Sequence, residues 1–163
     1  MDVEIVRGDI TTQDVDAVVN AANRAMRGGG GVDGAIHRAG GPAVLRDCVE
    51  RFPNGLDTGQ AGWTTAGDMP ARWVIHVVGP NRHAGQTDPD LLASCYREAL
   101  RVADELGAEA LAAPLVSAGV YGWPLDDAAR IAVETVRESD SKVALVRFVA
   151  FGADAEAALK AAR

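Results

Sequence analysis

The sequence predicts a single three-layer α/β/α domain built around a mixed, mostly parallel central sheet. The chain has 163 residues, which is enough for one domain with a full hydrophobic core. Short apolar runs typical of buried strands alternate with longer segments of helical character, and this alternation is typical of α/β folds. No repeat, low-complexity tract or second domain is visible, so residues 1–163 are expected to form one unit.

The expected strands are short apolar runs bounded by turn residues. They comprise residues 3–7, 17–20, 62–66, 73–78, 110–116 and 143–151. Gly8-Asp9 closes the first run, and the second is too short for a helix. Gly79-Pro80-Asn81 ends the fourth. The polar, turn-rich residues 81–90 that follow are expected to form a surface loop.

The expected helices comprise residues 34–39, 42–51, 91–106, 125–137 and 155–162. Asp33 is placed as the N-cap of the first helix, and Pro42 lies in the first turn of the second. In the third helix, apolar side chains recur at helical spacing and predict one buried face.

The turns at the carboxyl ends of the strands are where such a sheet places its ligand. These turns are Gly8-Asp9-Ile10, residues 20–34, residues 117–122 and Phe151-Gly152. Residues 28–31 are four consecutive glycines at the start of an expected helix. Glycine has no Cβ, so a ligand can approach the main-chain N–H groups closely, and an anion is the usual ligand at a helix start.

The composition disfavours nucleic acid and membrane surfaces as partners. The net charge is −7, and Lys142 and Lys160 are the only lysines, so main-chain amides would have to hold any phosphate. Cys48 and Cys95 show no metal-ligand spacing, which suits a reducing cytosol. The charged N-terminus is not a signal peptide, and no apolar run approaches a membrane span. We expect a cytoplasmic monomer without metal or cofactor.

Common nucleotide and hydrolase motifs do not account for the glycine run. Gly29, Gly31 and Gly34 match GxGxxG, but they follow the second strand instead of lying in the first strand–helix turn. A P-loop, a GxSxG elbow around Ser117 and an HExxH spacing are absent. A dinucleotide-dependent oxidoreductase is therefore a remote interpretation.

Several sequence blocks together resemble the macrodomains, specifically the MacroD-type ADP-ribosyl hydrolases that include O-acetyl-ADP-ribose deacetylases. The blocks are GDIT at 8–11, DAVVNAAN at 16–23, GGGGVDGAIHRAGG at 28–41, TGQA at 58–61, MPARWVIHVVGP at 69–80 and SAGVYGWP at 117–124. They occur in family order and span nearly the whole chain. The resemblance implies a three-layer macrodomain fold.

The resemblance also implies ADP-ribose as the ligand. Asp9 would accept a hydrogen bond from the adenine amino group beside the Ile10 backbone, and Phe151 would pack on the adenine. The diphosphate would lie between two sets of main-chain amides, those of Gly30, Gly31 and Val32 and those of Ser117, Ala118, Gly119, Val120 and Tyr121. Asn23 and Asp33 would meet the distal ribose. Ala118, where many members have Thr, and Trp123, where Tyr or Phe is frequent, depart from the family pattern.

Each of these residues also has a structural interpretation. A neutral amide suits a sugar hydroxyl beside a diphosphate, so Asn23 is assigned a function, whereas Asn20, also placed in the ligand-binding set, is more typical of a residue that turns the chain. Asp33 could cap its helix, but a carboxylate near a diphosphate is better explained if it orients or deprotonates a water. His37 and His76 are interpreted as core histidines.

The predicted function is hydrolysis of the ester that joins ADP-ribose to an acidic side chain of a modified protein, and deacetylation of O-acetyl-ADP-ribose. Asn23 and Asp33 would hold the water with help from the substrate's own phosphate, without a metal. The expected partners are ADP-ribose, ADP-ribosylated proteins and O-acetyl-ADP-ribose. The alternative is a non-catalytic module that reads ADP-ribose.

Overall fold

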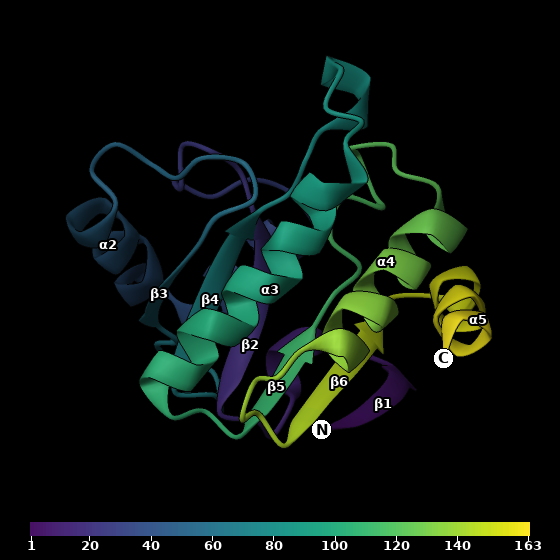
Figure 1. Cartoon of the computed structure of the whole chain (residues 1–163). Coiled ribbons are helices and arrows are strands. Elements are labelled where there is room, and N and C mark those ends of the chain that lie inside the picture. Colours follow the sequence, from purple (N-terminus) through teal and green to yellow (C-terminus); the bar gives the residue numbers. More distant parts are fainter.

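A computed structural model of the chain describes all 163 residues, Met1–Arg163. Six strands form one sheet in the order β1-β6-β5-β2-β4-β3 (Figure 1). The strands are β1 Asp2–Arg7, β2 Ala17–Ala22, β3 Ala61–Thr65, β4 Trp73–Val78, β5 Ala110–Ala113 and β6 Leu145–Ala150. Every neighbouring pair is parallel except β3 and β4. The prediction of a mixed, mostly parallel sheet is confirmed.

Helices cover both faces of this sheet. They are α1 Gly31–Gly40, α2 Pro42–Arg51, α3 Pro89–Leu106, α4 Leu125–Glu138 and α5 Ala153–Ala162, with short 3-10 helices η1 Ile10–Thr12 and η2 Arg82–Ala84. The larger core packs α3, α4 and α5 on one face, and these three helices stand in front of the sheet in Figure 1. Ile36 of α1 and Val44 of α2 are fully buried in two smaller cores that include residues of the sheet. The three-layer arrangement is thereby confirmed, and no helix has the length and apolar character to cross a membrane.

The start of α1 differs from the prediction, and Asp33 is not its N-cap. The helix begins at Gly31, its N-cap is Gly30, and no side chain caps it. The first intrahelical bond runs from the Gly34 N–H to the Gly30 carbonyl at 3.2 Å. Gly31, which was expected to precede the helix, is already its first residue, and this places Asp33 inside the first turn.

Strand β5 is three residues shorter than predicted because the chain leaves the sheet at Pro114, which has no N–H to donate to a ladder. Tyr96 of α3 takes over the hydrogen bonding there. Its hydroxyl donates to the Pro114 carbonyl at 2.9 Å and accepts from the Val116 N–H at 3.0 Å. A buried side chain of α3 thus fixes the segment that leads into residues 117–122.

Candidate functional site

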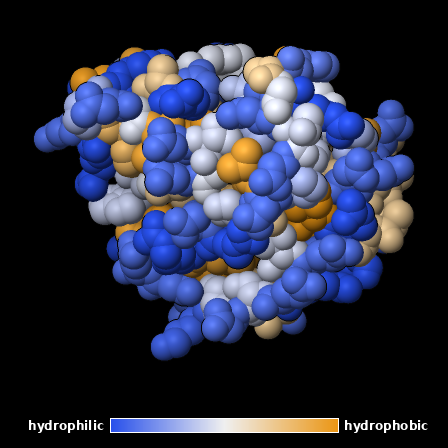
Figure 2. Space-filling view, turned by 45° about the horizontal axis from the view of Figure 1, so that its top comes forward, coloured by the Kyte–Doolittle hydropathy of each residue, from blue (hydrophilic) through white to orange (hydrophobic).

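A groove crosses the molecule at the carboxyl ends of β2, β5 and β6. It has three connected parts, and Val32 lines all of them. The inner pocket, of about 370 Å³, lies between residues 29–33 and residues 115–121. The outer pocket, of about 730 Å³, is lined by residues that include Asp9 and Phe151. The middle pocket lies between Pro114 and the start of α5. Figure 2 turns this edge toward the viewer and shows weakly polar and apolar residues in its middle, bordered by hydrophilic ones.

The groove brings together all but one of the residues predicted for the site. The inner pocket is lined by Asn23, Gly30, Gly31, Val32, Asp33, Ser117, Gly119, Val120 and Tyr121. Asp9, Ile10 and Phe151 line the outer pocket, and Ala118 lines the middle one. The exception is Asn20, which is fully buried and lines none of these pockets. Its place in the ligand-binding set is corrected, because β2 continues to Ala22 and carries Asn20 into the interior beneath the groove.

The outer pocket presents an ordered carboxylate and an exposed aromatic ring. Asp9 Oδ1 accepts hydrogen bonds from the Thr11 N–H at 2.9 Å and from Thr11 Oγ1 at 2.7 Å. These bonds lower the pKa of Asp9, the hydroxyl first and the main-chain N–H second, so the carboxylate is ionised at neutral pH. Phe151 lines the same pocket and is 94% exposed, so its ring is accessible to a flat apolar group.

The glycine loop exposes main-chain donors to the inner pocket. The N–H groups of Gly31, Val32 and Asp33 precede the first intrahelical bond of α1, so no helix carbonyl satisfies them. A Cβ on Gly30 or Gly31 would meet nothing within 4 Å, because both residues border open space. Gly31 also has a φ of 57°, which a residue with a side chain adopts only at a cost. The loop is therefore suited to an anion that contacts bare backbone.

Residues 117–122 form the opposite wall of the inner pocket. The N–H groups of Gly119, Val120 and Tyr121 have no main-chain partner. Ser117 has a φ of 67°, a strained value for a non-glycine residue, and its buried Oγ has no hydrogen-bond partner. Trp123 holds the loop in place, with its Nε1–H donating to the Pro80 carbonyl at 3.1 Å. Unpaired donors therefore face each other across the groove.

Asn23 and Asp33 converge on one point of the inner pocket. A Cβ on Gly29 would lie 3.1 Å from Asp33 Oδ2 and 3.3 Å from Asn23 Nδ2. Asn23 is held by its own loop, since its Nδ2 donates to the Gly28 carbonyl at 3.1 Å and its Oδ1 accepts from the Met26 N–H at 3.2 Å. Gly29 was not among the predicted site residues, although its lack of a side chain makes room for these two polar groups.

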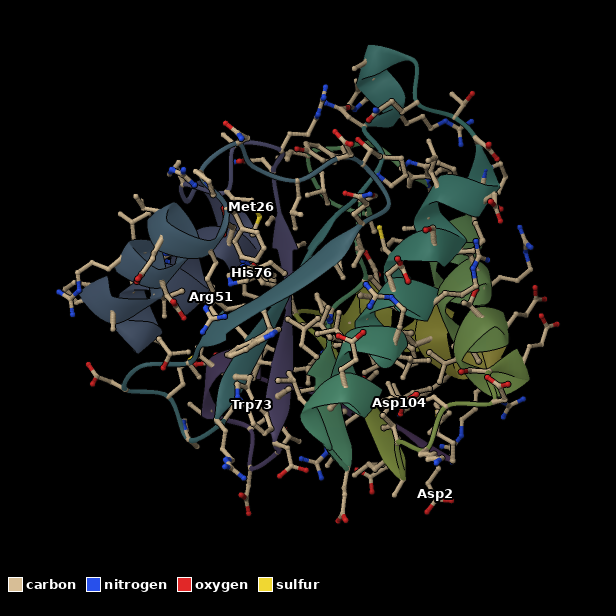
Figure 3. The ribbon with its side chains drawn as sticks, turned by 60° about the vertical axis from the view of Figure 1, so that its left-hand side comes forward. Asp2, Met26, Arg51, Trp73, His76 and Asp104 are labelled. Atoms are coloured by element: carbon tan, nitrogen blue, oxygen red, sulfur yellow. The ribbon has the colours of Figure 1, made fainter.

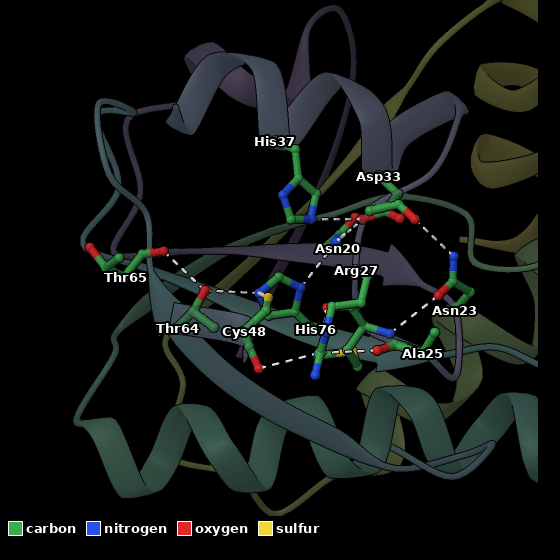
Figure 4. A network of polar contacts seen from close by, with 12 residues as sticks. Asn20, Asn23, Ala25, Arg27, Asp33, His37, Cys48, Thr64, Thr65 and His76 are labelled. Atoms are coloured by element: carbon green, nitrogen blue, oxygen red, sulfur yellow. Dashed lines mark hydrogen bonds and ion pairs between the residues drawn. The ribbon is translucent and has the colours of Figure 1, made fainter. Parts of the chain in front are cut away.

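The other oxygen of Asp33 faces a network of buried polar side chains, drawn in Figure 4. Asn20 Nδ2 donates to Asp33 Oδ1 at 2.8 Å, and His37 Nε2 lies 3.4 Å from the same oxygen. His37 was interpreted only as a core histidine, but it contacts the carboxylate predicted to be catalytic. The i,i+4 spacing of Asp33 and His37 on one helix is the sequence signal that could have revealed this contact.

His76 is completely enclosed below this network and is a core histidine, as predicted. Burial, and then the charge of His37, lower its pKa from 6.5 to about 3, so the ring is neutral at physiological pH. Burial likewise raises the pKa of the neighbouring Cys48 thiol to about 11, which makes it unreactive as a nucleophile. No group of three or more His, Cys, Asp or Glu side chains is placed to hold a metal ion.

Comparison with known proteins agrees with this geometry. Residues 19–132 match the family model described as Macro domain. The macro domain-containing protein SCO6450 of Streptomyces coelicolor is 58% identical over 163 residues, 98% of this chain and 96% of that protein. The human ADP-ribose glycohydrolase MACROD2 is 48% identical over 138 residues, 83% of this chain and 32% of the human protein. An Oceanobacillus iheyensis macrodomain mutant with ADPR (ADP-ribose) has a TM-score of 0.93 and 39% identity, covering 98% of this chain and 90% of that one.

Sequence and structure thus point to the same family by separate routes. The family model covers well over half of the chain, and the fold matches a solved macrodomain along nearly its whole length. The chain belongs to the macro domain family.

Proposed function

We propose that this protein binds ADP-ribose in the groove and hydrolyses its ester bond to acidic side chains of modified proteins. The observation that carries the proposal is the convergence of Asp33 Oδ2 and Asn23 Nδ2 over Gly29, between two walls of unpaired N–H groups. The name of MACROD2, an ADP-ribose glycohydrolase, supports the same activity.

The outer and inner pockets together accommodate the three parts of the ligand. The adenine lies in the outer pocket, where Asp9 accepts from its amino group beside the Ile10 backbone and Phe151 covers its face. The diphosphate lies between the free N–H groups of the two loops, which supply donors without a basic side chain. The distal ribose reaches the inner pocket beside Asn23 and Asp33.

The chemistry needs a positioned water but no strong acid. Water attacks C1″ of the distal ribose, the bond from C1″ to the modified side chain breaks, and the carboxylate leaves with the electron pair. Because the conjugate acid of that leaving group has a pKa of about 4.3, it departs without protonation. Asp33 Oδ2 and an oxygen of the substrate's phosphate accept hydrogen bonds from the water, and Asp33 takes up the one proton that the water loses on attack. O-acetyl-ADP-ribose is an ester of the same ligand, and hydrolysis releases acetate from it.

The linkage preference tests this function. Mass spectrometry should follow the release of ADP-ribose from two matched peptides, one modified on glutamate and one on serine. Release is expected from the glutamate conjugate, whereas the serine conjugate should persist because an alkoxide leaves poorly without a general acid. Equal release from both peptides contradicts the mechanism. Tight ADP-ribose binding without release from either peptide identifies a reader module.

Asp9 is the test of the adenine position. Asp9→Asn keeps an oxygen that can accept from Thr11 but weakens acceptance from the adenine amino group, and calorimetry should show about a tenfold higher Kd for ADP-ribose. Asp14→Asn is the matched control, because Asp14 is exposed on the same connection and lines none of the three pockets. An unchanged Kd in Asp9→Asn removes Asp9 from the binding site.

A further inference from the structure

A chain of hydrogen bonds runs from Asp33 through the protein interior to the edge strand β3. Asn20 Nδ2 donates to Asp33 Oδ1 at 2.8 Å and lies 3.0 Å from His76 Nδ1. His76 Nε2 lies 2.8 Å from Thr64 Oγ1, which donates to the Thr65 carbonyl at 3.0 Å. Figure 4 shows this chain, and Figure 3 shows His76 in the interior beside the sheet. Asn20, Thr64 and His76 are each at most 1% exposed.

The direction of every bond in this chain is set from its two ends. The Thr65 carbonyl can only accept, so the Thr64 hydroxyl gives its proton to it and accepts from His76 Nε2–H. His76 therefore carries its proton on Nε2, and its Nδ1 is an acceptor. Asn20 then gives one N–H to this acceptor and the other to the Asp33 carboxylate. A main-chain carbonyl of β3 thus determines how the amide beside Asp33 is oriented.

The hydrogen bonding of Asn20 indicates that its neighbours determine the orientation of its amide. Its Oδ1 is buried without a hydrogen-bond partner, which is a cost that a freely chosen amide orientation would avoid. The reversed amide would turn Oδ1 toward a carboxylate oxygen and toward the lone pair of His76 Nδ1, and both contacts are repulsive. Only the Nε2–H form of His76 favours the orientation that serves Asp33.

We propose that His76, held in this form by Thr64, is a positioning residue that fixes Asn20 and through it the Asp33 carboxylate. The inference rests on the proposed function, because the geometry of Asp33 matters only if its free oxygen works on a water. Asn20 and His76 are cross-strand neighbours in the β2–β4 register, so the contact is built into the sheet. A low pKa keeps the ring neutral and its Nδ1 available as an acceptor, with Asp33, His37, Asp47 and Cys48 the titratable groups around it.

Thr64→Val tests this role while preserving the shape of the side chain. Without the hydroxyl, His76 Nε2–H loses its acceptor, and the Nδ1–H form gains population by donating to a reversed Asn20. Nitrogen NMR of the labelled ring should show the Nε2–H form in the wild type and a second form in the variant. Turnover is expected to fall about tenfold, as for one lost hydrogen bond, with the Kd for ADP-ribose within about twofold of the wild type. Thr64→Ser restores the hydroxyl and should rescue both readouts.

Val74→Ala is the matched control for lost stability. Val74 is a buried residue of β4 that lies opposite Thr64 of β3 in the antiparallel pair. It takes no part in the hydrogen-bond chain. The Val74→Ala variant should have a lower Tm, while the protonation form of the His76 ring and the turnover stay unchanged. The inference is wrong if wild-type His76 carries its proton on Nδ1, or if Thr64→Val behaves like Val74→Ala in ring form and turnover. If the wild type shows no hydrolysis, the proposed function is refuted. The protonation form of the His76 ring and the carbon-13 chemical shift of the Asp33 carboxyl still decide whether Thr64 acts through His76 on Asp33.

Discussion

Replacing Asp33 by alanine is expected to lower the turnover of a glutamate-linked conjugate by about 10²–10⁴-fold, the usual contribution of a general base. The Kd for free ADP-ribose should stay equal or improve slightly, because a negative charge beside the diphosphate is removed. Opposite movement of rate and affinity is the decisive result. It is measured by single-turnover kinetics and calorimetry on the same preparation.

Asp33→Asn separates the charge of this side chain from its position. The amide oxygen can still accept from Asn20, so the hydrogen bond of 2.8 Å is kept, but no oxygen remains to take a proton from water. Turnover should be nearly as low as in Asp33→Ala, with a smaller loss of Tm. If turnover and affinity fall by the same factor in both variants, Asp33 is a binding or structural residue and the mechanism is wrong.

Gly30→Glu is expected to raise the Kd for ADP-ribose by about a thousandfold. Gly30 has an extended backbone with a φ of −95°, so a side chain there brings no backbone strain, and a Cβ would enter open space. The new carboxylate would accept hydrogen bonds from the main-chain N–H groups that are proposed to bind the diphosphate. Two unit charges about 4 Å apart repel by about 4 kcal/mol at an effective dielectric constant of 20, which is about a thousandfold in Kd.

Two matched variants divide this effect into size and charge. Gly30→Ala adds only a methyl group, and Gly30→Gln has nearly the length of glutamate without its charge. Calorimetry should give Kd values that rise in the order Ala, Gln, Glu, while Tm in the absence of ligand stays close to that of the wild type. If a folded Gly30→Glu variant binds as tightly as Gly30→Ala, the diphosphate does not lie against the glycine loop.

The sequence was sufficient for the fold because its strands are short apolar runs with clear turn residues between them. It was misleading at α1, where glycine has poor helix propensity and yet Gly30 is the N-cap and Gly31 the first residue of the helix. Only the contact geometry shows that the helix starts there, so the cap assigned to Asp33 was wrong. The end of β5 depended on Pro114 and on a hydroxyl from a distant helix, and no local pattern reveals the latter.

Residues that line the groove could be predicted from the sequence more readily than the polar residues buried beneath it. Asp9 and Asn23 come just after strands, and Asp33 lies in the first turn of the helix that follows β2, so all three are at the edge where a parallel sheet contacts its ligand. Asn20 was misplaced because a strand buried on both faces has no alternation to show which way a side chain points. The contact between His37 and Asp33 follows from their i,i+4 spacing on α1, and it could be predicted only once the helix was known to include Asp33.

The pairing of β1 with β6 makes formation of the outer pocket depend on the order in which the chain folds. These strands lie at opposite ends of the sequence and are joined side by side, with Arg147 Nε 2.8 Å from Glu4 Oε2 across 143 residues. The outer pocket takes Asp9 from just after β1 and Phe151 from just after β6. A chain emerging from the ribosome therefore has no outer pocket until β6 has been synthesised and paired, a late and non-local event. Under the proposed function, ADP-ribose bound in the completed pocket would stabilise the pairing of β1 with β6.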